Sequence, residues 1–145
     1  MAIDTTTKEN QERAEQEGEA LTDKVILVVD DSPTVCKIVQ VTLTKMGCRV
    51  VIAEDGLEAL AKIEDEKPDL ILLDIIMPHM DGYQVCSLIK KKPHYKHIPV
   101  VILSGKDGFF DKVRGRLAGS TGYITKPFQP DVLTETVEKH LTDRR

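Results

Sequence analysis

Short apolar runs that each end in a polar residue are the feature that most constrains this chain. The clearest run, Leu70 to Leu73, is followed at once by Asp74. Because the run shows neither helical nor alternating gaps, it predicts a strand that is buried on both faces, as in a parallel sheet. A carboxylate is costly to bury inside such a strand, but at the carboxyl end it can face a crevice. Asp74 is therefore the first candidate for a functional residue, and the rest of the chain is expected to support its chemistry.

Segments with strand and helix patterns alternate along the sequence. Predicted strands cover 24–29, 49–54, 70–73, 99–103 and 122–125, and predicted helices cover 33–46, 55–67, 82–91, 107–117 and 130–141. Ser32 and Pro33 favour a helix start, Gly47 favours a helix end, and Pro68 blocks the second helix. In the fourth helix, the expected packing side consists of Phe110, Val113 and Leu117. The alternation implies parallel strands joined by right-handed crossovers, an α/β fold with helices on both faces of the sheet.

Composition limits the number of domains and the kind of partner. At 145 residues and 41% hydrophobic content, the chain suits one domain with a single core. The formal net charge of −4 argues against binding to nucleic acid or to an anionic membrane. The apolar runs are too short to span a bilayer and the polar start has no signal-peptide core, so we expect a cytoplasmic protein without membrane insertion. The cysteines, which lack metal-site spacing, are expected to be reduced packing residues: Cys36, Cys48 and Cys86.

Residues 1–22 differ in composition from the rest of the chain. This stretch is acidic and has almost nothing to bury, so we expect a flexible tail before a folded domain at 23–142. Two interpretations stay open, a partner-specific arm and a solubilising extension.

Four of the five predicted strands deliver a reactive group to the edge where parallel strands end. These groups are Asp30, Asp31, Asp74, Ser104 and Lys126. Carboxylates brought together repel one another, and a divalent cation lowers that cost; oxygen ligands of this kind suit Mg²⁺. With an ammonium and a hydroxyl nearby, one carboxylate can attack a phosphoryl donor, giving an aspartyl phosphate on Asp74. Any one of these residues alone is more often a solvated strand end, and only their joint placement carries the hypothesis.

Four motifs, at 28–32, 72–82, 103–106 and 125–128, together resemble those of CheY-like response-regulator receiver domains, and the resemblance covers about residues 23–142. It implies a flavodoxin-like (βα)5 doubly wound sheet with strand order 2-1-3-4-5. It also implies that Mg²⁺ is bound by Asp31, Asp74 and the Ile76 backbone carbonyl, with Asp30 assisting through water. Further implied roles are phosphoryl pairing by Lys126, a switch hydroxyl on Ser104, a switch aromatic at Tyr123 and a cis peptide bond between Lys126 and Pro127.

The resemblance implies partners as well. A histidine kinase, either CheA-like or hybrid, would phosphorylate Asp74, and a downstream protein would bind the surface of the fourth helix, fifth strand and fifth helix. The stretches 86–90 and 104–112 are similar to those of PilG-type stand-alone receivers of type IV pilus chemosensory systems. No output domain follows residue 145, so we expect the signal to leave through a protein surface. Such a protein catalyses only its own phosphorylation and slow dephosphorylation and is not otherwise an enzyme.

Two positions near the motifs bear on the lifetime of the phosphoryl group. In receivers, the positions of Ile76 and Lys106 border the water that attacks the phosphoryl group. Because an apolar Ile76 cannot activate that water, slow intrinsic dephosphorylation is expected. Lys106 either attracts phosphate or is merely solvated.

His94 and His97 have a spacing that could bind a metal, but beside Pro93 and Pro99 they indicate a solvated loop.

Three other functions are compatible with parts of this sequence. A flavodoxin-like FMN protein would need a phosphate-cradling loop where this chain has Asp30 and Asp31. A haloacid-dehalogenase-like phosphatase also uses an aspartate and Mg²⁺, but it needs an acid at the position of Ile76. A pseudo-receiver would act as an unphosphorylated binding module, which the complete acidic set argues against.

Overall fold

A single parallel sheet forms the centre of the molecule. The computed structural model describes residues 21–105 and 109–142. Its strands are β1 (Val25–Val29), β2 (Arg49–Ala53), β3 (Leu70–Asp74), β4 (Val100–Ser104) and β5 (Gly122–Thr125). They pair in parallel in the order β2-β1-β3-β4-β5, which confirms the predicted topology.

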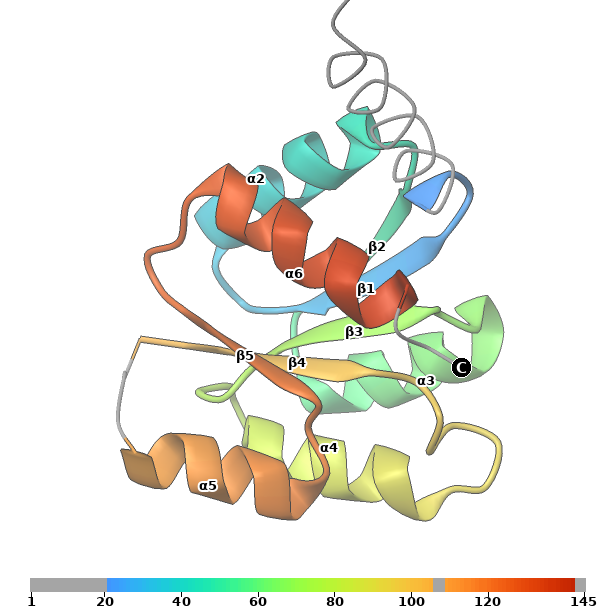
Figure 1. Ribbon diagram of the computed structural model, residues 1–145. Coiled ribbons are helices and arrows are strands. Elements are labelled where there is room, and N and C mark those ends of the chain that lie inside the picture. The colour runs from blue at the N-terminus through green and yellow to red at the C-terminus, as the bar shows by residue number, and fades with distance from the viewer. Residues whose placement is uncertain (1–20, 106–108, 143–145) are drawn as a thin grey trace, which may run out of the picture.

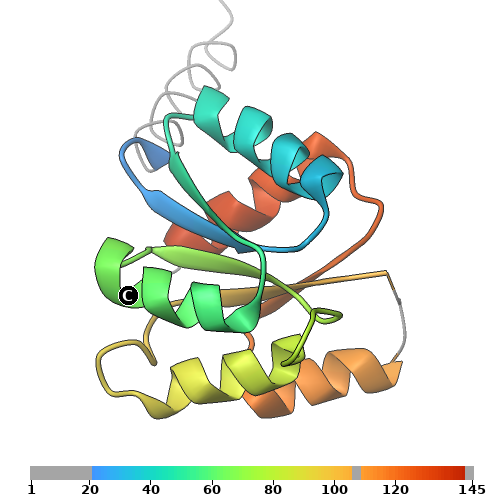
Figure 2. The ribbon, with the colours of Figure 1, turned by 180° about the vertical axis from the view of Figure 1, so that it is seen from behind.

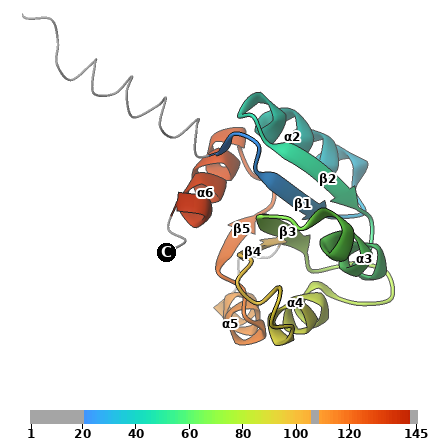
Figure 3. The same ribbon diagram turned by 90° about the vertical axis from the view of Figure 1, so that its right-hand side faces the viewer.

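Helices cover both faces of this sheet. They are α2 (Pro33–Lys45), α3 (Gly56–Glu66), α4 (Gly82–Lys91), α5 (Phe109–Ala118) and α6 (Pro130–Thr142). Helices α2 and α6 lie on one face, and α3, α4 and α5 lie on the other (Figures 1 and 3). Successive strand residues point to opposite faces, so Leu70 packs beneath α2 and α6 while Ile71 packs beneath the other layer. Burial on both faces is the reason that the strands are apolar throughout.

Local capping sets most of the helix boundaries. The Ser32 hydroxyl accepts a hydrogen bond from the Val35 N–H at the start of α2, with Pro33 as the first helical residue. A capping box between Asp81 and Gln84 begins α4. Helix α3 ends at Glu66, before the expected block at Pro68, because Lys67 adopts a left-handed conformation with φ of 49°.

Helix α5 departs from its predicted packing face. Leu117 was expected to pack, but it is 82% exposed, and Phe110 lies outside the residues whose side chains are described. The face of α5 that meets the sheet carries Gly115, where an added Cβ would lie 3.5 Å from Ile102. Because each helical residue turns by about 100°, Leu117 lies about 200° around the helix from Gly115 and therefore points to solvent.

The folded domain begins slightly earlier than residue 23. Leu21 is completely buried among residues of β1, α2 and α6. Its carbonyl oxygen accepts hydrogen bonds from the Lys24 N–H and the Cys48 thiol. Leu21 therefore belongs to the core and not to the predicted tail; residues 1–20 lie outside the described part of the chain.

The three cysteines are free and buried. Burial raises the pKa of the Cys48 and Cys86 thiols to about 11 each, so both are protonated at neutral pH. Within residues 21–105 and 109–142, no helix is both long and apolar enough to cross a membrane.

Candidate functional site

Strand register brings the predicted site residues to one edge of the sheet. Val29 pairs with Leu73, so Asp30 and Asp74, which follow them, lie level with each other on adjacent strands. Asp74 in turn pairs with Leu103, which places Ser104 one residue further on. Ser104 pairs with Thr125, so Lys126 follows directly at the end of β5. These carboxyl ends of the strands lie toward the left in Figure 1 and toward the right in Figure 2.

Lys126 links the two buried carboxylates. Its Nζ atom donates to Asp30 Oδ2 at 2.7 Å and lies 3.2 Å from Asp74 Oδ1. The Asp30 side chain is fully buried, the Asp74 side chain is 9% exposed and the Lys126 side chain is 21% exposed. This arrangement keeps two acidic groups close together inside the protein because a cation lies between them.

The backbone fixes both ends of this ion pair. Asp30 Oδ1 accepts a hydrogen bond from the Ser32 N–H at 2.9 Å, which leaves its other oxygen for Lys126. The Lys126 N–H donates to the Ser104 carbonyl at 2.7 Å, and the Lys126–Pro127 peptide bond is cis. The Ser104 residue itself is only 4% exposed. The ammonium group and the hydroxyl are thus both carried on backbone that is tied to the sheet.

Burial and neighbouring charge shift the titration of the site. Burial raises the pKa of the Asp74 carboxyl, the charge of Asp30 raises it further, and Lys126 only partly offsets these effects. For Lys126, burial alone would lower the pKa, but the hydrogen bond and charge of Asp30, together with Asp74, outweigh it and raise the pKa. A carboxylate with a raised pKa is one that a further cation would stabilise.

Asp31 completes an acidic group that fits a hard cation. One carboxylate oxygen from each of Asp30, Asp31 and Asp74 lies within 4.8 Å of the others. Asp31 is exposed, and a hollow of about 290 Å³ opens beside Asp30 and Asp31 and extends to Glu54. Across the described residues, no other group of three His, Cys, Asp or Glu side chains comes this close. Three carboxylates at one solvent-accessible edge match the oxygen ligands that Mg²⁺ prefers.

Gly82, the last residue of the 72–82 motif and the first residue of α4, packs against the backbone of the site. A Cβ atom at this position would lie 2.3 Å from the Asp74 carbonyl oxygen. The Gly82 N–H also donates to the Ile75 carbonyl at 2.8 Å. The start of α4 therefore lies directly against the backbone that carries Asp74. The Asp-Gly pair at 81–82 was visible in the sequence, but nothing local showed what the glycine contacts.

The structure describes two of the three positions expected to affect phosphoryl lifetime or switching, Ile76 and Tyr123. Ile76 is 73% exposed beside Asp74 and contributes no acidic group there. Tyr123 is half-buried on β5, with Lys112 Nζ 5.6 Å from the centre of its ring. Lys106 lies outside the described residues.

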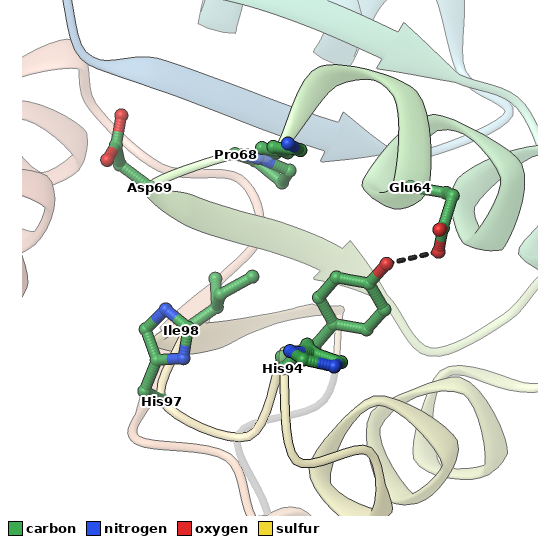
Figure 4. Close-up of a pocket in the computed structure, with 8 residues that line it drawn as sticks. Glu64, Pro68, Asp69, His94, His97 and Ile98 are labelled. Carbon is green, nitrogen blue, oxygen red and sulfur yellow. Dashed lines mark hydrogen bonds between the residues drawn. The ribbon is translucent and has the colours of Figure 1, made fainter.

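His94 and His97 lie at the opposite edge of the sheet, where β3 and β4 begin. They line a hollow of about 450 Å³ with Glu64, Asp69 and other residues, and the two imidazoles stand apart (Figure 4). The Tyr95 hydroxyl donates a hydrogen bond to Glu64. Both histidines are exposed, and within the described residues neither joins a close group of three potential ligands.

Comparison with known proteins places this geometry in context. The profile of the response regulator receiver domain matches residues 26–138. The protein PilG of Pseudomonas aeruginosa is 47% identical over 116 residues, which is 80% of this chain and 86% of PilG. PilH of the same organism is 40% identical over 112 residues, covering 77% of this chain and 93% of PilH. The chemotaxis response regulator CheY4 of Vibrio cholerae superposes with a TM-score of 0.79 at 34% identity, covering 82% of this chain and 99% of CheY4.

Proposed function

Because the chain belongs to the response regulator receiver family, we propose that it accepts a phosphoryl group on Asp74 from a histidine kinase of a two-component phosphorelay. One observation carries this assignment. Lys126 contacts Asp30 and Asp74 together, in a cluster that Asp31 joins within 4.8 Å. A nucleophilic carboxylate, a counter-cation and additional acidic ligands at one edge are the components that phosphoryl transfer requires.

The acidic group would hold Mg²⁺ through Asp30, Asp31, Asp74 and the backbone carbonyl of Ile76. When bound, Mg²⁺ would supply positive charge that offsets the repulsion among the carboxylates and the charge of the phosphoryl oxygens. The raised pKa of Asp74 supports this proposal, because burial and the charge of Asp30 both disfavour the ionised carboxylate and Lys126 offsets them only in part.

The reaction would use the side chains as follows. A carboxylate oxygen of Asp74 forms a bond to phosphorus while the phosphorus–nitrogen bond of a phosphohistidine breaks, and the released imidazole takes up a proton. The Lys126 ammonium, now shared between two aspartates, would pair with a phosphoryl oxygen. Ser104, one residue beyond the strand partner of Asp74, would donate its hydroxyl to another oxygen. These contacts are made to the transferred group and so favour the phosphorylated state.

The phosphorylated state would be transmitted through the surface of α5, β5 and α6, the fourth helix, fifth strand and fifth helix of the receiver. Movement of Ser104 toward the phosphoryl group would leave space into which Tyr123 turns. Tyr123 is half-buried and borders a hollow of about 310 Å³ that also includes Lys112 and Arg116. A downstream protein would distinguish the two states of this surface.

The similarity to PilG and PilH favours a role in motility or taxis, with a CheA-like or hybrid kinase as the phosphoryl donor. We place the protein in the cytoplasm, where such donors act and where three free thiols persist. The domain that carries this function is residues 21–142. The acid that a haloacid-dehalogenase-like phosphatase needs is replaced by Ile76, so phosphate-ester hydrolysis is the weaker alternative.

Acetyl phosphate with Mg²⁺, followed by intact mass measurement, tests the central step. We expect one added phosphoryl group in the wild-type chain and none in Asp74→Asn. Asp65→Asn, which changes an exposed aspartate on α3 in the same way, is the matched control and should be phosphorylated normally. A folded wild-type protein that gains no phosphoryl group, or an Asp74→Asn chain that still gains one, would refute the assignment.

A further inference from the structure

A groove between α2 and α6 is lined by exposed apolar side chains and two lysines, a lining that suits a binding partner. It encloses about 510 Å³ and is lined mainly by apolar atoms, with contributions from Lys37, Ile38, Val41, Lys45, Met46 and Pro130. Ile38 is 37% exposed and Val41 is 45% exposed. The only charged residues of α2 are two lysines, Lys37 and Lys45, and both line this groove. Its occupant should therefore carry carboxylates and cover modest apolar surface.

The described chain starts next to this groove. Leu21 is anchored in the core, and the Asp23 N–H donates to the Gly47 carbonyl at 2.9 Å. Gly47 follows Met46, which lines the end of the groove. The segment that precedes Leu21 is therefore attached to the domain within a few residues of Lys45.

Residues 1–20 carry the complementary charge. Six acidic residues stand against two basic ones in this segment, a net charge of −4. The whole chain has 24 acidic and 20 basic residues, so the remaining 125 residues hold 18 of each and are neutral overall. The acidic residues of the segment are Asp4, Glu9, Glu12, Glu15, Glu17 and Glu19. All of the excess negative charge is thus concentrated in one segment, attached beside a groove whose only charged lining residues are lysines.

The segment is long enough to reach both lysines. Lys37 and Lys45 are eight residues apart on one helix, or about 12 Å along its axis. Twenty extended residues can span up to about 66 Å. Attachment through a short connection gives an effective concentration of the order of millimolar, so even a weak electrostatic contact is populated before a free acidic partner binds.

We propose that residues 1–20 bind along the α2–α6 groove of their own chain, with their carboxylates facing Lys37 and Lys45. The segment then covers Ile38 and Val41 and leaves Asp74 open to small phosphoryl donors. A protein that needs the exposed face of α2 must displace it. Salt and the charge of the segment therefore control access to this face.

A spin label tests this placement. The variant Asn10→Cys provides one accessible thiol, since the native cysteines are buried, and a nitroxide attached there broadens nearby amide signals in ¹⁵N spectra. At low salt, we expect loss of the Ile38, Val41 and Lys45 amide signals. At about 0.5 M NaCl, where charges are screened beyond a few ångströms, these signals should return.

Charge reversal separates this groove from other sites. Lys37→Glu with Lys45→Glu should abolish the broadening, whereas Lys91→Glu with Lys92→Glu, an equal change of charge at the end of α4, should leave it intact. Broadening confined to the α5–β5 hollow, or no broadening at all, would overturn the proposal. So would broadening of an unlabelled ¹⁵N chain mixed with a spin-labelled ¹⁴N chain, because binding would then occur between two copies.

Discussion

Replacing Gly82 by alanine tests how closely the start of α4 is packed against the residue proposed to accept the phosphoryl group. A Cβ atom at Gly82 would lie 2.3 Å from the Asp74 carbonyl oxygen and 2.8 Å from the Ile75 Cα. Ordinary contact begins near 3.4 Å, so the two backbones must separate by about 1 Å. Because the neighbouring atoms belong to the backbone, no rotamer change can relieve the clash.

The expected cost follows from two opposing effects. Overpacking of this kind costs about 3 kcal/mol, the upper end of the usual range, while alanine recovers at most about 1 kcal/mol through its higher helix propensity, because Gly82 is the first residue of α4. A net loss of at least about 2 kcal/mol corresponds to a fall in melting temperature of at least about 8 °C for a domain of this size. A displacement of about 1 Å at Asp74 should also slow its phosphorylation on the order of 10²-fold.

Thermal unfolding and the rate of phosphorylation by acetyl phosphate measure the two effects. Gly105→Ala is the matched control, because an added Cβ there meets no atom within 4 Å. It should change stability by less than about 0.5 kcal/mol. If Gly82→Ala melts and reacts like Gly105→Ala, the inferred contact between α4 and the end of β3 is wrong.

Three further substitutions test the electrostatics and lifetime of the site. In the wild type, the raised pKa of Asp74 means that its contribution to stability is fully present below the ordinary pKa of 3.8 and is lost as pH rises through the folded-state value. Asp74→Asn should therefore be more stable than the wild type in urea at pH 7, with the difference shrinking toward pH 4; an equal difference at both pH values would contradict this reasoning. Lys126→Met leaves two buried carboxylates without their counter-ion and should lower the free energy of unfolding by about 2–3 kcal/mol at pH 7, a value reduced because Lys126 is partly exposed. The loss should be smaller at low pH, where the carboxylates are protonated. Unchanged unfolding in urea would show that the ion pair contributes nothing to stability. Because Ile76 is 73% exposed, Ile76→Gln should leave the melting temperature unchanged. It should shorten the lifetime of the aspartyl phosphate at least about tenfold, measured as loss of the phosphoryl mass over time. Loss of the phosphoryl group within seconds from the wild type itself would refute the expected slow dephosphorylation.

Much of the fold could be predicted because its signals are local. Unbroken apolar runs such as Leu70 to Leu73 indicate strands covered on both faces, and Ser32 and Asp55 set helix starts by accepting hydrogen bonds from nearby backbone N–H groups. Alternation of strands and helices then leaves few topologies. Helix α5 was predicted, but its packing face was not, because that face depends on which residue allows a close approach to the sheet. That residue is Gly115, which has no apolar side chain to signal it.

The sequence by itself determined which chemical groups end the strands, because polar residues after apolar runs lie where the buried part of the strand stops. Only the tertiary structure decided how those groups pair. Register between strands places Lys126 2.7 Å from Asp30 and 3.2 Å from Asp74, a contact between residues 96 and 52 positions apart in the chain. Tertiary packing also sets Gly82 against the Asp74 backbone and ties Asp23 to Gly47, just after the end of α2. Such distances depend on packing between layers, and no local pattern of residues encodes them.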